Sequence, residues 1–260
     1  MKNPATIRAL GAETAEGDGG ERGPDFQPLY SQVKALLIRR IATGQWRAGA
    51  AVPSEMRLAA EFGVSQGTVR RAIEELAAQN LVTRQQGRGT FVATHAGDRA
   101  RFHFMHVVPN RGDKQIPTGR LRSLKEARAT RLQAERLQLQ RGAAVFNLVR
   151  VRIIGGAPVM FERIALPVER FRGLQLPLNE ERPDELYIVY EQQFGVTIVR
   201  AQERLGAVAA EAAEATHLGV AAGTPLLEVE RVALILDGTP VEWRVTRVDS
   251  RDHHYAITIE

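Results

Sequence analysis

The strongest constraint on the fold is the stretch of residues 53–92, in which two helix signals, a short break and a glycine-centred hairpin follow one another. Ser54 can cap the first helix by accepting a hydrogen bond from a free amide of its first turn, and Glu55 favours the positive helix end. Gly63 can take the left-handed conformation that ends a helix, and Ser65 can cap the next one. This stretch therefore predicts a helix-turn-helix.

The second predicted helix, Gln66–Asn80, has one apolar and one polar side. Its apolar residues recur with the spacing of a single buried stripe, namely Val69, Ala72, Ile73 and Leu76. The residues that point outward near its N-terminal end are Gln66, Thr68, Arg70 and Arg71. In helix-turn-helix proteins this part of the second helix enters the major groove of DNA, where arginine binds guanine and glutamine binds adenine. A solvated helix face is the alternative for one helix alone, but the turn, the spacing and the hairpin together favour DNA.

A hairpin with a basic tip follows the second helix. Val82–Arg84 and Thr90–Val92 have the composition of strands, and Gln86–Gly89 supplies a tight turn. Arg88 lies at the tip, where it can contact a phosphate or the minor groove. A further helix over Leu29–Thr43 is predicted to pack behind the motif. The whole pattern is that of a winged helix-turn-helix, a DNA-binding fold.

The distribution of charge agrees with DNA binding. Residues 26–94, which contain the motif, hold nine Lys or Arg and four Asp or Glu, whereas the longer segment 95–260 holds twenty-three and twenty-one. The positive excess therefore lies on the motif, as attraction to phosphate requires. At 260 residues the chain is long enough for two domains.

Composition also bears on compartment and chemistry. The chain has no cysteine, which excludes a disulfide scaffold and suits the cytoplasm, and no apolar run long enough to span a membrane. Residues 1–25 are rich in Gly, Ala and Glu without an apolar segment, so we predict a flexible tail and not a signal peptide. There is no nucleophile elbow and no metal-ligand spacing, so no catalytic residue, cofactor or metal is predicted.

Five stretches carry a family resemblance, namely Pro28–Gly44, Val52–Ala59, Gly63–Ala72, Leu81–Val82 and Gly87–Val92. Together they resemble the DNA-binding half of the GntR transcription regulators, which implies a winged helix-turn-helix domain over residues 26–94. By this resemblance the positions that contact DNA are Arg57, Ser65, Gln66, Thr68, Arg70 and Gly89. Gln66 departs from the basic residue that many members carry there, which bears on the base sequence that is read.

An internal repeat organises the rest of the chain. The segment Leu137–Arg150, followed by Gly156–Val159, recurs as Leu218–Arg231 followed by Gly238–Val241. Each copy reads as a helix end, a glycine turn, a strand, a Gly-x-Pro hairpin and a return strand. Two copies are too few for a solenoid, which favours two hairpin units in one antiparallel sheet.

Three segments of the same region have helical spacing, namely Arg131–Leu137, Glu185–Phe194 and Ala209–Leu218. The fold class predicted for the chain is therefore α+β, in which a winged helix-turn-helix is followed by an antiparallel sheet with packed helices. A polar, glycine-containing linker over residues 95–101 is expected to lead into a second domain over residues 102–260.

Strand alternation locates a candidate pocket in the second domain. Arg150 and Arg152 fall on one face of a strand, so their guanidinium groups point into the same volume and suit an anionic ligand. On the return strand Glu162 is a single carboxylate among apolar residues, and Glu242 follows the hairpin of the second copy. The alternative is that the two arginines only form cross-strand ion pairs with Glu162.

Six segments carry a second resemblance, namely Val149–Arg152, Pro158–Arg163, Glu185–Tyr187, Phe194–Gly195, Leu218–Leu227 and Asp237–Glu242. They resemble the UTRA domain, the effector module of the HutC-type branch of GntR regulators, whose fold is that of chorismate lyase. The resemblance implies a small-molecule pocket that uses Arg150, Arg152, Glu162, Tyr187, Glu242 and Tyr255. Members that bind sugar phosphates usually carry a serine where this chain has Glu185. A carboxylate there repels phosphate, so a small carboxylate metabolite is favoured as the effector.

These observations predict a DNA-binding transcriptional regulator. Because two-fold protein symmetry reads two-fold DNA, we expect a homodimer on a short palindromic operator of double-stranded DNA. Binding of a small anionic metabolite is expected to relieve repression by lowering operator affinity. The alternatives are a chorismate lyase-like enzyme fused to a DNA-binding domain and a DNA binder without an effector. The lack of catalytic motifs opposes the first, and the size and balanced charge of the second domain oppose the second.

Overall fold

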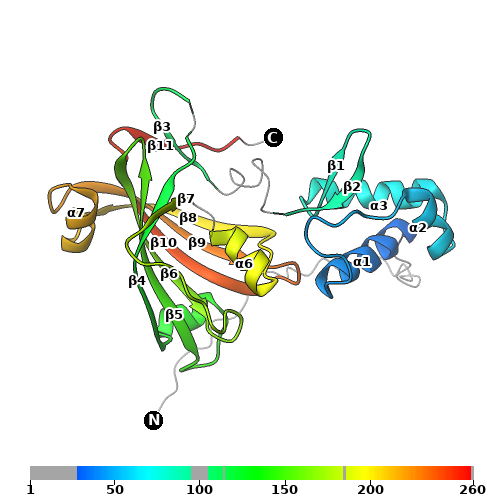
Figure 1. The fold of residues 1–260 in the computed structure, drawn as a ribbon, viewed down its shortest axis with the longest axis horizontal. Helices are drawn as coiled ribbons and strands as arrows, with labels where there is room; N and C mark the ends of the chain where they lie inside the picture. The colour runs from blue at the N-terminus through cyan, green and yellow to red at the C-terminus, as the bar shows by residue number, and fades with distance from the viewer. Residues whose placement is uncertain (1–27, 95–104, 114, 184–185, 259–260) are drawn as a thin grey trace, which may run out of the picture.

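The computed structural model describes residues 28–94, 105–113, 115–183 and 186–258. Figure 1 shows a small helical domain at one end of the molecule and a large twisted sheet at the other. The predicted tail over residues 1–25 and the predicted linker over residues 95–101 lie outside the described residues. The domain boundaries drawn from the sequence therefore stay predictions.

The N-terminal domain has the predicted winged helix-turn-helix fold. Its elements are α1 (Leu29–Ala42), α2 (Glu55–Phe62), α3 (Gln66–Ala78), β1 (Val82–Gln85) and β2 (Gly89–Val92). β1 and β2 form an antiparallel hairpin, the wing. α3 ends slightly earlier than predicted, because Asn80 takes a left-handed conformation with φ of 58°.

Local signals fix the ends of α2 and α3. The Ser54 hydroxyl accepts a hydrogen bond from the Arg57 amide at 3.3 Å, and the Ser65 hydroxyl accepts one from the Thr68 amide at 3.2 Å. Gly63 has φ of 66°, a conformation that glycine adopts without the strain that a β-carbon causes. These residues set the turn that orients α3 relative to α2.

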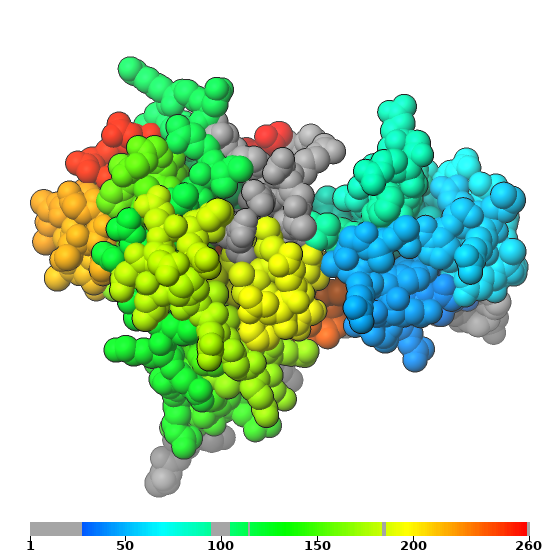
Figure 2. All heavy atoms as spheres, in the orientation of Figure 1, coloured from blue at the N-terminus to red at the C-terminus, as the bar shows by residue number. Residues whose placement is uncertain are grey.

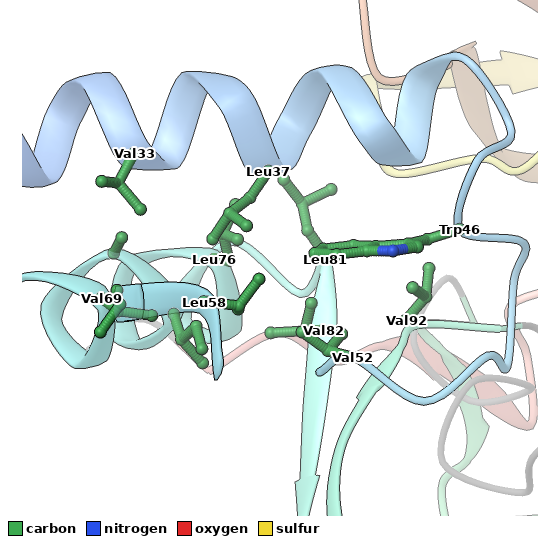
Figure 3. Packing of buried hydrophobic residues seen from close by; sticks show 13 residues of the cluster. Val33, Leu37, Trp46, Val52, Leu58, Val69, Leu76, Leu81, Val82 and Val92 are labelled. Carbon is green, nitrogen blue, oxygen red and sulfur yellow. The ribbon is translucent and has the colours of Figure 1, made fainter. Parts of the chain in front are cut away.

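A closed apolar core holds the three helices against the wing. Figure 3 shows side chains of α1 above those of α2 and α3, with Trp46 at the end nearest the wing. The buried members of this core include Val33, Leu37, Leu58, Val69, Ile73, Leu76 and Val92. The apolar stripe predicted for α3 belongs to this core, so the opposite side of α3 faces outward.

The C-terminal domain is built on a seven-stranded antiparallel sheet with the strand order β7-β4-β5-β6-β10-β9-β8. Among the residues that the structure describes, three helices and a small second sheet of β3 and β11 accompany it. Within the described ranges, no helix is both long and apolar enough to cross a bilayer. The elements are β3 (Val107–Pro109), β4 (Thr118–Arg128), α5 (Arg131–Arg136), β5 (Ala144–Ile154), β6 (Ala157–Pro167), β7 (Glu181–Pro183), α6 (Leu186–Phe194), β8 (Arg200–Ala209), α7 (Ala212–Leu218), β9 (Pro225–Leu234), β10 (Pro240–Val248) and β11 (His253–Tyr255).

The internal repeat of the sequence forms two matching halves of the sheet. β5 and β6 form the first hairpin, and β9 and β10 form the second, as predicted. β6 pairs with β10 along the seam between the halves. Each half is extended by strands that were not predicted from the sequence, namely β4 and the short edge strand β7 in the first half and β8 in the second.

The two faces of the sheet pack against different helices. α6 packs on one face through Leu186 and Tyr190. The other face contacts the ends of α5 and α7 through Leu137 and Leu218. Because side chains alternate along a strand, Arg150 of β5 points to the face covered by α6, which we call the α6 face.

One helix prediction was wrong at its start. The alanine-rich stretch from Ala209 was expected to be helical, but Ala209 ends β8 and α7 begins only at Ala212. Ala210 makes backbone hydrogen bonds with Thr224 and Gly223 instead, at 2.8 and 2.9 Å. The extended pairing prevails because the helix propensity of alanine is a weak preference that tertiary contacts override.

Candidate DNA-binding surface and effector pocket

The outward side of the helix-turn-helix is polar and basic. Thr68 is half-buried, and its hydroxyl lies 2.9 Å from that of Ser65. The other predicted DNA-contacting residues are all exposed, namely Arg57, Ser65, Gln66, Arg70, Arg71, Arg88 and Gly89. They are thus accessible to DNA, and their contact with it stays a prediction.

The two neighbouring arginines of α3 lie in different surroundings. The Arg71 guanidinium stacks on the ring of Tyr30 in α1, 3.8 Å from its centre. The Arg70 Nε instead donates a hydrogen bond to Glu55 at 2.9 Å. Arg71 therefore lies on the flank next to α1, whereas Arg70 lies beside the start of α2.

Glu55 joins three elements of this surface. Its carboxylate accepts hydrogen bonds from Arg70 and Gln66 of α3, at 2.9 and 3.4 Å, and from Arg84 of the wing at 3.3 Å. From the sequence, Glu55 was predicted only as a helix-end residue, and Arg84 was not predicted as a site residue. These contacts join residues that are distant in the sequence, so no local pattern shows them.

Buried charges lie on the α6 face of the sheet. Arg150 stands directly opposite Glu162, and its Nε and Nη2 lie 2.7 and 2.6 Å from Glu162 Oε2. Arg152 reaches Glu162 Oε1 at 3.7 Å and the sulfur of Met105 at 3.0 Å. The cross-strand ion pair considered as an alternative is therefore present, but it is buried, with side-chain exposures of 4% and 1%. The neighbours of Glu162 on its own strand face are apolar, as predicted, and its charged partners come from the neighbouring strands.

The second hairpin adds arginines to the same network. Arg244 Nη1 lies 3.3 Å from Glu162 Oε1, and its Nε and Nη2 donate to Glu242 at 3.0 and 2.8 Å. Arg231 of β9 stands directly opposite Arg244 in the strand register and donates to Glu203 of β8 at 2.5 Å. The sequence analysis did not identify Arg231, Arg244 or Glu203.

The arginines of this network outnumber its carboxylates. Arg231 and Arg244 stand opposite each other on the adjacent strands β9 and β10, and like charges in this arrangement repel each other. The network comprises Arg150, Arg152, Arg231 and Arg244 with Glu162, Glu203 and Glu242. Its net charge is positive, so an anion bound against it gains electrostatic stabilisation.

A pocket that opens to solvent lies against this network. Three arginines and one carboxylate contribute to its wall, which is otherwise formed by polar and apolar side chains in similar measure. The lining residues are Met105, His106, Val107, Arg152, Met160, Glu162, Val229, Arg231, Arg244, Thr246 and Tyr255. Its chemistry suits a small ligand with an anionic group and an apolar part.

The structure brings most of the predicted effector residues together. Arg152, Glu162 and Tyr255 line the cavity. Arg150 and Glu242 do not line the cavity. Arg150 contacts the lining residue Glu162, and Glu242 contacts the lining residue Arg244. Tyr187 joins them through Glu242. Glu185 lies outside the described residues, so the structure gives no position for it.

α6 supplies two phenols to the network. Tyr187 and Tyr190 donate to the two oxygens of Glu242, at 3.0 and 2.8 Å. Burial and the Glu242 carboxylate raise the pKa of Tyr187 to about 12, and they raise the pKa of Tyr190 well above its usual value. Both phenols therefore stay protonated donors near neutral pH.

α6 also contacts the N-terminal domain. Glu191, the residue after Tyr190, accepts a hydrogen bond from Thr94 at the end of the winged helix-turn-helix. Val199 and Leu236 pack against the apolar core of that domain. Figure 2 shows α6, in yellow, against the blue N-terminal helices. One helix thus contacts both the charged network and the DNA-binding domain.

We expect the C-terminal domain to lose stability as the pH rises from about 10 to about 12, and we expect Tyr187→Phe to remove part of this loss. In that window the unfolded chain has released the phenolic proton and the fold retains it, so the free energy of unfolding decreases with pH. Urea unfolding at several pH values measures the effect. Tyr30→Phe, in the other domain, is the control, and an unchanged pH dependence in Tyr187→Phe contradicts the assignment.

Comparison with known proteins matches both domains. Residues 29–92 match the family of bacterial regulatory proteins called gntR, and residues 113–254 match the UTRA domain. The HTH-type transcriptional repressor NagR of Bacillus subtilis is 30% identical over 219 residues, which cover 83% of this chain and 88% of that protein. The histidine utilization repressor of Pseudomonas putida is 36% identical over 161 residues, 60% of each chain.

A solved structure supports the assignment of the second domain. The ligand-binding domain of a GntR-family transcriptional regulator from Bordetella bronchiseptica is 30% identical, with a TM-score of 0.56 over 62% of this chain and 99% of that chain. The relatives are transcriptional regulators and not enzymes, so the lyase-like alternative has no support. From these matches and the two domains described above, the chain belongs to the GntR family of bacterial transcription regulators and carries a UTRA domain.

Proposed function

We propose that this protein represses transcription as a homodimer on a short palindromic operator, and that a small anionic metabolite bound in the C-terminal domain releases it. The observation that carries the proposal is the pairing, in one chain, of an exposed basic helix-turn-helix with a cavity whose wall has three arginines and one carboxylate. The names of the relatives, a repressor NagR and a histidine utilization repressor, support repression.

The N-terminal half of α3 and the wing are proposed to make the DNA contacts. Gln66, Arg70 and Arg88 present amide and guanidinium groups at the surface. Such groups bind base edges in the major groove and phosphates or the minor groove beside it. A homodimer presents two such helices, which is the reason for expecting a palindrome.

The cavity on the α6 face is proposed to bind the effector through its anionic group. Arg152 and Arg231 contribute guanidinium groups to the wall, while Met160 and Val229 contribute apolar surface. A small carboxylate metabolite fits this mixture, since guanidinium binds carboxylate in a two-pronged arrangement. α6 then offers the route to the other domain, and coupling of this kind typically amounts to about 1–3 kcal/mol.

A thermal-shift screen with a panel of small carboxylates and phosphate esters tests the effector proposal. We expect at least one carboxylate to stabilise the protein, by about 2.7 kcal/mol at a concentration of 100 times its Kd. Arg152→Gln should abolish this stabilisation. Arg163→Gln is the matched control, because Arg163 lies on β6 but pairs with Glu214 of α7, away from the cavity. A panel without effect, or an Arg152→Gln variant that responds like the wild type, contradicts an anionic effector at this site.

A further inference from the structure

An acidic side chain lies in the middle of the DNA-binding surface. The Glu55 side chain is 22% exposed, and its contacts come from Gln66, Arg70 and Arg84. A carboxylate at this place repels phosphate and cancels part of the positive charge that the domain presents to DNA. Electrostatic attraction to DNA alone therefore does not explain why Glu55 is there.

Glu55 holds Arg70 in a way that suits base recognition. The hydrogen bond uses Nε of Arg70, while the Nη groups lie at the far end of a side chain that is 55% exposed. Arginine recognises guanine through a fork of two N–H groups. A guanidinium that is already oriented loses less conformational freedom when it binds, which strengthens the cognate contact.

The same carboxylate fixes the wing relative to α3. Arg84 of β1 donates through Nη2 to Glu55, and its Nη1 lies 3.6 Å from Glu74 of α3. The two DNA-facing elements, α3 and the wing, are thereby connected through one residue at the start of α2. An arginine held between two carboxylates is also less available to a phosphate of an arbitrary sequence.

We propose that Glu55 is a positioning residue for base recognition, which orients Arg70 and Arg84 before DNA binds and lowers the affinity for non-cognate DNA. The proposal rests on the DNA-contacting role of α3 described above. A purely structural role is the competing explanation, because Glu55 lies in the first turn of α2, where a negative charge stabilises the helix.

The test compares variants of the full chain on two duplexes. One duplex is selected by the wild-type protein from a random library, and the other is a scrambled sequence of the same composition. Glu55→Gln removes the charge, whereas Glu55→Asp keeps a charge at the helix end but shortens the side chain by one methylene. Glu61→Gln is the matched control, since Glu61 is also in α2 and pairs with Arg40.

We expect Glu55→Gln to bind the scrambled duplex several-fold more tightly, with a dependence of log K on log salt that is steeper by about one. The ratio of the two affinities should fall about tenfold, because the oriented arginines contribute to discrimination between bases. Glu55→Asp should lose the same ratio while its melting temperature stays close to that of the wild type. Glu61→Gln should change neither the ratio nor the salt dependence.

One result would overturn the proposal. An affinity ratio equal to that of the wild type in both Glu55 variants, whether or not the two affinities change by a common factor, would leave Glu55 as a helix-end residue only. The DNA-contacting role of α3 is tested separately with Arg70→Ala. If α3 does not contact DNA, this variant binds the selected duplex as tightly as the wild type, whatever the Glu55 variants show.

Discussion

Replacing Glu162 with alanine is expected to lower the free energy of unfolding of the C-terminal domain by about 3–5 kcal/mol, the usual cost of leaving a buried charge without its partner. Glu162 is 1% exposed and receives Arg150 at 2.6 Å and Arg244 at 3.3 Å. Arg152 lies 3.7 Å away. Without the carboxylate, three guanidinium groups with side-chain exposures of 4%, 9% and 6% repel one another.

Trp243 reports this loss by its fluorescence during urea unfolding. The chain has two tryptophans, one in each domain, so the experiment is done in a Trp46→Phe background. Glu228→Ala is the control, because Glu228 pairs with Arg247 at a more exposed position, where such pairs contribute at most about 1 kcal/mol. If Glu162→Ala destabilises the domain no more than Glu228→Ala does, the buried network is not a major part of its stability.

Replacing Arg70 with alanine is expected to weaken binding to the selected duplex about tenfold to hundredfold, the equivalent of one lost arginine–guanine contact of about 1–3 kcal/mol. Arg70 is the arginine of α3 that Glu55 orients toward the surface. Binding to the scrambled duplex should change much less, because only general attraction to phosphate is affected. Fluorescence anisotropy with both duplexes at several salt concentrations measures the two effects.

Arg71→Ala is the matched control for this experiment, since it removes the same charge from the next residue of α3. Arg71 stacks on Tyr30, so we expect it to contribute to both duplexes alike and to leave their affinity ratio unchanged. If the duplex that the wild-type protein selects has no two-fold symmetry in its sequence, this contradicts the proposed homodimer. Equal behaviour of Arg70→Ala and Arg71→Ala would show that α3 does not read bases through Arg70.

The N-terminal domain was predictable because its signals act over short distances. Ser54 and Ser65 cap amides in the following turn, and Gly63 ends α2 by its own conformation. The wing turn is set by two glycines close to each other, Gly87 and Gly89, which both have positive φ. What the sequence did not reveal there is Glu55, whose partners lie on other elements.

The charged network beside the candidate pocket was predictable only in its first half. Arg150 and Glu162 lie on neighbouring strands of one hairpin, so alternation and a short turn suffice to pair them. Arg231 and Arg244 join them only through the pairing of β6 with β10, whose register no local pattern specifies. The repeat did contain a signal, because Arg231 ends the copy of the segment that ends at Arg150.

The strands β4 and β8 were not predicted, for a different reason. Most residues of β8 are exposed or half-buried, so its sequence lacks the alternation that marks a strand with one buried side. β4 has a single buried residue, Leu121. Such strands are identified by the neighbour whose hydrogen bonds they complete, and that neighbour is unknown until the sheet is assembled.

α6 directly connects the charged network with the DNA-binding domain. Tyr190 and Glu191 are consecutive residues, and the first binds Glu242 in the charged network while the second binds Thr94 of the DNA-binding domain. Because a single peptide unit joins these two residues, we expect a displacement of Tyr190 to move Glu191 as well. Ligand binding in the pocket would therefore affect the DNA-binding domain through α6 and not through the rest of the sheet.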